Sequence, residues 1–211
     1  VMHIPTKTIL AILPLGYADH SAAGMGIDGS DRNPEPLIAN WPVRGLYMPD
    51  AMAHFSTPAG NFLIFANEGD AREYDPFEEE IRIKDKNYKL DKTKFPEGDL
   101  YKEDFCMGRL NATNTMGDTD NDGDYDEIYV FGSRGFAIAD ATTAAKVYES
   151  GDQFEQITLA DPKIGKIFNA SNSDNDAQGR SDNKGPEPEA VTTGAIRDTV
   201  YAFIGLERIG G

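Results

Sequence analysis

Gly117-Asp118-Thr119-Asp120-Asn121-Asp122-Gly123-Asp124-Tyr125-Asp126-Glu127 leads directly into Ile128-Tyr129-Val130-Phe131. The second stretch is β-branched and aromatic, which predicts a strand. The first stretch has an acid at every second position, and carboxylates packed so densely repel one another unless a cation lies among them. The spacing is that of a calcium loop, with a glycine at the sharp turn. Its expected ligands are Asp118, Asp120, Asp122, Asp124 (through its backbone carbonyl) and Asp126.

The loop is not a helix-loop-helix EF-hand, because Tyr129 stands where that motif needs a bidentate glutamate. A D-x-D-x-D-G-x-x-D loop that runs into a strand resembles the calcium hairpins of integrin-type β-propellers. Hard oxygen ligands without histidine or cysteine argue against zinc and copper and favour Ca²⁺ as the cofactor. A solvated acidic turn without an ion is the alternative.

The composition restricts the classes of partner. The chain has 211 residues and a formal net charge of −16, which argues against nucleic acid and anionic membranes and favours cations. No apolar run is long enough to span a bilayer.

The single cysteine, Cys106, cannot form an internal disulfide and is expected to be a small buried residue.

Short strand-like runs separated by Gly, Pro, Asn and Asp predict an all-β fold, either a sandwich, a barrel or a propeller. Short helices are expected at most near 46–54 and 99–105, and 17–45 and 169–188 are interpreted as long surface loops. The expected strands are 8–13, 61–66, 79–84, 127–132, 135–139, 145–148, 155–159 and 199–204.

An internal repeat favours the propeller. One copy starts at Pro49-Asp50-Ala51-Met52 and the other at Pro188-Glu189-Ala190-Val191. In each copy a strand follows, and a second acid, Glu68 or Glu207, comes after the strand. The separation between the first acid, Asp50 or Glu189, and the second acid is the same in both copies. Repeated β-units of this kind are typical of propeller blades, whose equivalent tips gather around one axis. Because the last strand ends close to the end of the sequence, we expect residues 1–211 to be part of one propeller domain of a longer chain.

Several motifs occur in a fixed order along the chain: Trp41-Pro42-Val43, Tyr47-Met48-Pro49-Asp50, Ala66 to Arg72, Gly108-Arg109-Leu110, Gly117 to Asp126, Gly151 to Gln156, Arg180 to Glu189 and Gly205 to Arg208. Together they resemble the choice-of-anchor I family. That family includes mesenchyme-specific cell-surface glycoproteins and secreted bacterial proteins labelled alkaline-phosphatase-like. The resemblance implies a secreted or cell-surface β-propeller but no settled activity. One departure is Gly135, where the family pattern has serine, close to the candidate site residue Arg134.

The acids and arginines at the repeat tips form a second group of candidate site residues. If the tips share an axis, they could hold a second divalent ion and a phosphate gripped by arginine. The alternative is a set of structural ion pairs that plugs a channel. The candidates are Asp50, Glu68, Asp70, Arg72, Glu189, Glu207 and Arg208.

Two functions therefore remain open. The first is a calcium-binding extracellular or cell-surface module that acts by binding or as a structural element. The second is a metal-dependent phosphomonoesterase, alkaline-phosphatase-like or phytase-like. Expected partners are calcium, a phosphate-bearing ligand or extracellular matrix or mineral, and the remaining blades of a parent protein. No serine-hydrolase elbow or P-loop is visible, and Asn111 and Asn169 begin glycosylation sequons.

Overall fold

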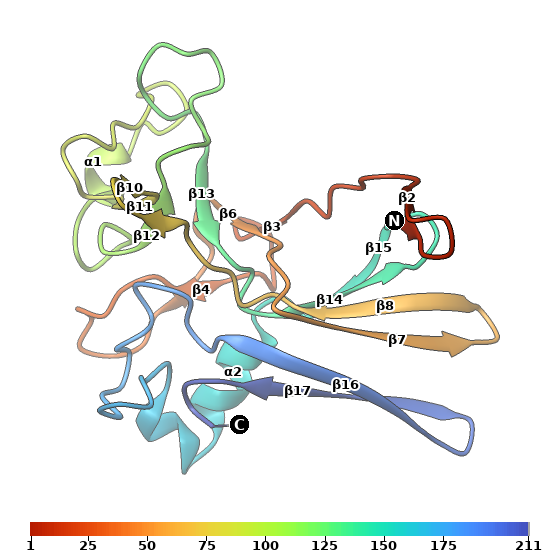
Figure 1. Ribbon diagram of the computed structural model, residues 1–211. Coiled ribbons are helices and arrows are strands. Elements are labelled where there is room, and N and C mark those ends of the chain that lie inside the picture. Colours follow the sequence, from red (N-terminus) through yellow and green to blue (C-terminus); the bar gives the residue numbers. More distant parts are fainter. Residues whose placement is uncertain (211) are drawn as a thin grey trace.

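The computed structural model describes residues 1–210, and most of its regular structure is β (Figure 1). The elements in chain order are β1 (Met2–His3), β2 (Thr8–Ile9), β3 (Tyr17–Asp19), β4 (Ile27–Asp28), β5 (Ile38–Ala39), β6 (Val43–Leu46), β7 (Ala51–Thr57), β8 (Gly60–Ala66), β9 (Glu73–Tyr74), β10 (Phe77–Glu78), β11 (Glu80–Arg82), α1 (Gly98–Tyr101), β12 (Asn111–Thr113), β13 (Ile128–Phe131), β14 (Phe136–Asp140), β15 (Lys146–Glu149), α2 (Gln153–Ala160), the 3₁₀ helix η1 (Ile164–Ile167), β16 (Pro188–Ile196) and β17 (Thr199–Leu206).

A five-stranded sheet has the order β11-β12-β13-β6-β3 and carries the larger apolar core. Every residue of β13 is buried, and β13 runs parallel to β6, pairing Ile128 with Val43. A strand buried on both faces is a continuous apolar run rather than an alternating one, which explains the sequence of residues 128–131. Tyr88, Met107 and Leu110 complete this core from the loops around the sheet.

A four-stranded sheet, β15-β14-β8-β7, lies beside a separate hairpin, β16-β17 (Figure 1). The hairpins β7-β8 and β16-β17 are the two predicted repeat copies. They lie next to each other, and Thr193 Oγ1 donates a hydrogen bond to the His54 carbonyl at 3.2 Å. The all-β class is confirmed. The sheets of residues 1–210 do not close into a ring, so the propeller remains a prediction.

Two element predictions are wrong. Residues 155–159 lie in helix α2, not in a strand, because the side chains that turn inward are Glu155 and Thr158, while Ile157 is 64% exposed. The β-branched residues there indicated a strand, but the buried stripe follows helical spacing. Residues 46–54 form the end of β6 and the start of β7 rather than a helix, whereas the helix expected near 99–105 is α1.

Neither predicted surface loop lies at the surface throughout. The segment 17–45 contains β3 to β6 and the fully buried His20 and Asp28. In the segment 169–188, Asn169, Ser181 and Glu187 are fully buried. Its polarity was misleading because these groups find hydrogen-bond partners in the interior, where a satisfied polar group is tolerated.

The guanidinium of Arg134 organises that polar interior. Its Nη1 donates to Glu155 Oε1 at 2.6 Å and to the Asp28 carbonyl at 2.8 Å. Its Nη2 donates to the carbonyls of Ser181 at 2.6 Å and Asn183 at 2.9 Å. Arg134 and Glu155 are almost fully buried. Arg134, a candidate site residue, is therefore an interior clamp between α2 and the segment 169–188.

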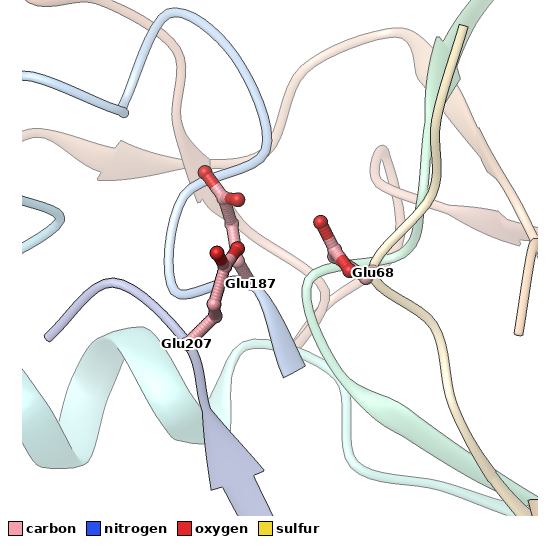
Figure 2. Close-up of side chains that lie close together, drawn as sticks. All are labelled: Glu68, Glu187 and Glu207. Carbon is pink, nitrogen blue, oxygen red and sulfur yellow. The ribbon is translucent and has the colours of Figure 1, made fainter. Parts of the chain in front are cut away.

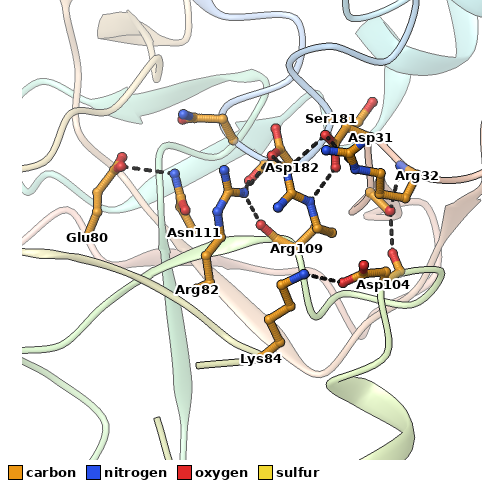
Figure 3. A network of polar contacts seen from close by, with 12 residues as sticks. Asp31, Arg32, Glu80, Arg82, Lys84, Asp104, Arg109, Asn111, Ser181 and Asp182 are labelled. Carbon is orange, nitrogen blue, oxygen red and sulfur yellow. Dashed lines mark hydrogen bonds and ion pairs between the residues drawn. The ribbon is translucent and has the colours of Figure 1, made fainter. Parts of the chain in front are cut away.

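A second polar network joins the five-stranded sheet to the same segment (Figure 3). Arg82 Nη1 lies 2.5 Å from Asp182 Oδ2, and Arg109 Nη2 lies 3.2 Å from the same oxygen. Arg109 Nε also donates to Asp31 Oδ1 at 2.7 Å. The sheet and the segment that leads into β16 are thus held together largely by charged groups.

Candidate functional site

The acidic loop of residues 117–127 connects β12 to β13 and is closed at its base by backbone hydrogen bonds. The amides of Asp126 and Glu127 donate to the Gly117 carbonyl at 2.9 and 3.1 Å. Gly117 has φ +110°, and a Cβ there would clash with the Glu127 carbonyl oxygen. The ring of Tyr125 stacks on Tyr88 at 4.0 Å between centroids, which anchors the loop to the core.

Three of the five predicted calcium ligands converge. Asp118, Asp120 and Asp126 each offer a carboxylate oxygen, and these oxygens lie within 4.8 Å of one another. The amides of Asp122 and Gly123 donate to the two oxygens of Asp118, at 3.2 and 3.1 Å, which orients that carboxylate. Gly123 has φ +96°, as the sharp turn of the motif requires.

Without a cation, the negatively charged carboxylates of the loop repel one another. Partial desolvation and the charges of Asp122 and Asp126 raise the pKa of Asp120. Partial desolvation and the charge of Asp122 likewise raise the pKa of Asp124. Hydrogen bonds from Thr119 lower the pKa of Asp126. A divalent cation would relieve the repulsion.

The donor set fits a hard cation. Only carboxylate oxygens converge, and no lysine or arginine of residues 1–210 forms an ion pair with Asp118, Asp120 or Asp126. The side chain of Asp122 accepts the Asp124 amide at 3.1 Å and does not join the three. Asp124 lines an open pocket with Asp91 and Lys92. Oxygen ligands of this kind suit calcium better than a softer metal.

A second carboxylate cluster lies where the two hairpins end (Figure 2). Glu68 follows β8, Glu187 precedes β16 and Glu207 follows β17, and their oxygens lie within 4.8 Å of one another. Figure 2 shows the three side chains reaching the same region from separate segments. The repeat tips therefore do come together.

Every member of this cluster has a basic partner. Arg180 Nε and Arg208 Nε lie 2.5 and 3.1 Å from the two oxygens of Glu187. Lys184 Nζ lies 2.6 Å from Glu68 Oε1, and Arg208 Nε lies 3.1 Å from Glu207 Oε2.

Burial and ion pairing shift the carboxyl pKa values of Glu187 and Glu207 in opposite directions. Burial alone would raise the pKa of Glu187, but Arg180 and Arg208 hold it below its usual range. Burial and the neighbouring glutamates raise the pKa of Glu207, even though Arg208 opposes that shift. The cluster, which has three carboxylates and three basic groups, is internally compensated.

The other predicted tip residues do not join the three converging carboxylates. Arg72 Nε pairs with Glu79 Oε2 at 2.9 Å, and its guanidinium lies over the ring of Phe77. Asp50 and Asp70 line a pocket that Glu68 also lines. Glu189 is close enough to raise the pKa of Glu207 but does not belong to the three converging carboxylates.

Glu187 was not among the predicted site residues, although it is the central acid of the cluster. It is fully buried and has φ +50°. The available signal was the pair of bases that precede it, Arg180 and Lys184, in a segment interpreted as a solvated loop. Both sequon asparagines are also buried, and Asn111 and Asn169 donate to Glu80 and Glu155 at 2.9 and 3.0 Å. A glycan at either position would displace an interior hydrogen bond.

Comparison with known proteins adds one family and one relative. The family model described as the choice-of-anchor I domain matches residues 1–211. Gigasin-3a of Magallana gigas is 32% identical over 110 residues, which are 51% of this chain and 38% of that protein. The matched segment thus spans less than half of this relative. No solved structure matches the chain, and no helix within residues 1–210 is both long and apolar enough to cross a membrane.

Proposed function

The chain belongs to the choice-of-anchor I domain family, whose domain is typical of extracellular and surface-anchored proteins, and we propose that it is a calcium-binding module of this kind. We propose further that its sheets are blades of a larger β-propeller, completed by other parts of a longer parent protein. In this proposal the bound ion holds the loop before β13 rigid, and the function of the module lies in what its surface binds, such as matrix, mineral or a phosphate-bearing ligand.

The observation that carries the calcium proposal is the convergence of Asp118, Asp120 and Asp126, none of which forms an ion pair with a lysine or arginine among residues 1–210. Carboxylates held this close together repel one another, and a bound cation relieves the repulsion. The second acidic cluster illustrates the contrast, because each of its glutamates has a lysine or arginine within ion-pair distance. Residues 117–127 contain no lysine or arginine that could offset these carboxylates. The proposal therefore assigns that role to an external cation.

Thermal unfolding with and without calcium tests this proposal. At a free calcium concentration 100 times the Kd, binding to the folded state alone adds about 2.7 kcal/mol of stability. For a domain of this size that gain raises the Tm by roughly 5 to 10 °C. The shift should disappear in Asp120→Asn and persist in Asp198→Asn, a matched charge change at the exposed turn between β16 and β17. A Tm unaffected by calcium or chelator in the wild type would refute the metal assignment.

The cluster of Glu68, Glu187 and Glu207 supports a second candidate, a metal-dependent phosphomonoesterase. Carboxylates that converge beside Arg208 and Lys184 could bind a metal-bridged phosphate, provided the basic groups leave their present partners. The bases are all engaged, which favours the structural interpretation. For this reason the calcium-held module is the leading proposal.

Phosphate release separates the two candidates. The substrates are p-nitrophenyl phosphate and phytate, assayed with calcium and then with chelator. A phosphomonoesterase should lose turnover in Glu207→Gln while keeping its wild-type Tm shift with calcium, because the acidic loop is untouched. Absence of turnover in the wild type, together with an intact calcium shift, would eliminate the enzyme and retain the binding module.

A further inference from the structure

Residues 84–94, which we call the lysine strap, lie between β11 and α1 and are rich in positive charge. The strap contains Lys84, Lys86, Lys89, Lys92 and Lys94, although the whole chain has a formal net charge of −16. The last four of these side chains are exposed, and none of the four forms an ion pair with an acid among residues 1–210. Lysine-rich runs of this length are typical of surfaces that bind polyanions.

The backbone of the strap is fixed to the acidic loop of residues 117–127. The Asp91 amide donates to the Tyr125 carbonyl at 3.0 Å, and the Tyr125 amide donates to the Lys89 carbonyl at 2.8 Å. Tyr88, within the strap, is fully buried. A ligand of the strap would therefore meet a backbone that is already ordered, which lowers the entropic cost of binding.

Lys102, which follows α1, adds a third ammonium group beside those of Lys89 and Lys92. Its Nζ donates to the Asp85 carbonyl at 3.0 Å and to the Tyr88 carbonyl. Burial lowers the pKa of Lys102, and no acid of residues 1–210 lies within ion-pair distance of it. An ammonium has three N–H donors, so two carbonyls leave one donor for a ligand.

These three lysines border one open pocket of about 520 Å³. Its volume lies within the range of roughly 300 to 1,000 Å³ that is usual for pockets that bind small molecules. One wall is apolar and consists of Leu90, Phe95 and Pro96. The pocket thus offers ammonium groups without a counter-ion in residues 1–210, next to a surface that can pack against carbon.

Three carboxylates, those of Asp91, Asp99 and Asp124, line the same pocket. Asp91 Oδ1 accepts the amides of Thr93 and Lys94 at 3.0 and 2.6 Å, which orients this carboxylate. Ionised carboxylates only accept hydrogen bonds, so they repel a ligand that offers anionic oxygens alone and suit one that also offers hydroxyl donors. A sulfated sugar has both kinds of group, and the C–H groups of its ring can contact the apolar wall.

We propose that this pocket binds a sulfated sugar unit of an extracellular polysaccharide. The ammonium groups of Lys89, Lys92 and Lys102 hold the sulfate, and the carboxylates accept the sugar hydroxyls. The proposal rests on the proposed function, because it names what the surface of the extracellular module binds, but no calcium ion takes part in the contact. Because two of the lysines are exposed, the affinity should fall as salt is added.

Isothermal titration calorimetry with a fully sulfated heparin tetrasaccharide tests the proposal on the folded chain, with calcium in excess. The double variant Lys89→Gln, Lys92→Gln should bind at least about tenfold more weakly, since two charge-assisted hydrogen bonds are lost. The matched control is Lys163→Gln, Lys166→Gln, which removes two exposed lysines at the same spacing and should bind like the wild type. No binding by the wild type, or equal losses in both double variants, would overturn the proposal.

Two further ligands test whether the pocket recognises sulfate on a sugar. The desulfated tetrasaccharide should bind at least about tenfold more weakly, because the lysines lose their anionic partner. Single-stranded DNA of equal charge should also bind more weakly, since it brings few hydroxyl donors to the carboxylates. Equal binding of the desulfated sugar would contradict the role of the lysines, and equal or tighter binding of DNA would indicate a general polyanion surface instead.

Protection of lysines from acetylation locates the contact on the unmodified chain. The tetrasaccharide should slow acetylation of Lys89 and Lys92, measured by peptide mass spectrometry, and should leave Lys163 and Lys166 as reactive as before. Equal protection of both pairs would contradict the pocket as the site of binding.

The calcium response separates this proposal from the calcium proposal. The double variant Lys89→Gln, Lys92→Gln should keep the rise in Tm that calcium causes in the wild type, because the acidic loop is untouched. A wild type that responds to calcium but binds no tetrasaccharide would overturn the pocket alone. Tetrasaccharide binding without a calcium response would support the pocket and refute the metal assignment.

Discussion

His20 should make the stability of this protein fall steeply in mild acid. The ring is fully buried, and Nδ1 donates to the Met25 carbonyl at 2.7 Å. Nε2 has no partner within residues 1–210. Burial, reinforced by the positive charge of Arg134, lowers the pKa of His20 to about 4.

The sign and size of the effect follow from linkage. Between the unfolded pKa of about 6.5 and the folded value, the unfolded chain binds a proton that the folded chain does not, so the free energy of unfolding decreases as the pH falls. The contribution of His20 is complete above pH 6.5 and is lost progressively toward pH 4. The shift corresponds to about 3 kcal/mol in total, of which about 2.5 kcal/mol is lost by pH 4.5.

Urea unfolding of the wild type and of His20→Asn at pH 7.5 and 4.5 measures this term. The amide nitrogen of asparagine can replace Nδ1 without titrating, so the variant should be less stable at pH 7.5 and lose less stability in acid. The difference between the two proteins should therefore shrink by about 2 to 3 kcal/mol. Substitution of the exposed His54 by asparagine serves as the control for the loss of an imidazole ring. A difference that is the same at both pH values would refute the buried, neutral state of His20.

Three further substitutions test the interior. Gly132→Ala should cost about 3 kcal/mol or more in urea unfolding, because Gly132 has φ +71° and a Cβ there would clash with the Glu68 carbonyl. Glu155→Gln should cost about 3 to 5 kcal/mol by leaving the buried charge of Arg134 uncompensated, and adding Arg134→Met should recover part of the loss. Glu187→Gln should lower the Tm by several degrees without changing the calcium response, since two arginines lose their shared carboxylate. A Tm unchanged in Glu187→Gln would mean that these ion pairs contribute nothing.

The predictable parts of the fold are those in which the local sequence of a segment is sufficient to indicate its structure. The apolar run 61–66 and the run 127–132 form strands β8 and β13, and the repeat placed two equivalent hairpins. The spacing of the acidic loop identified three carboxylates that converge. In each case the residues that determine the structure are neighbours in the sequence.

The remainder depends on contacts between distant segments. Polar composition predicts a surface segment, yet half of the residues in 169–188 are buried, because Arg134 and Arg82 bind carbonyl and carboxylate groups of this segment. Nothing local in the segment shows that those arginines will lie beside it. Glu187 was missed although its partner Arg180 is close in the sequence, and its other partner, Arg208, follows the last strand of the second hairpin.

The polar interior around Arg134 also has a calorimetric consequence. The heat capacity of unfolding rises with the apolar surface that becomes exposed and falls with the polar surface. Unfolding of this chain exposes carbonyls, a guanidinium and carboxylates that are buried in the native state. Its heat capacity change per residue should therefore lie below the usual 12 to about 15 cal/mol/K. The curve of stability against temperature is correspondingly shallow, so cooling should weaken this protein less than a protein of equal size whose interior is apolar throughout.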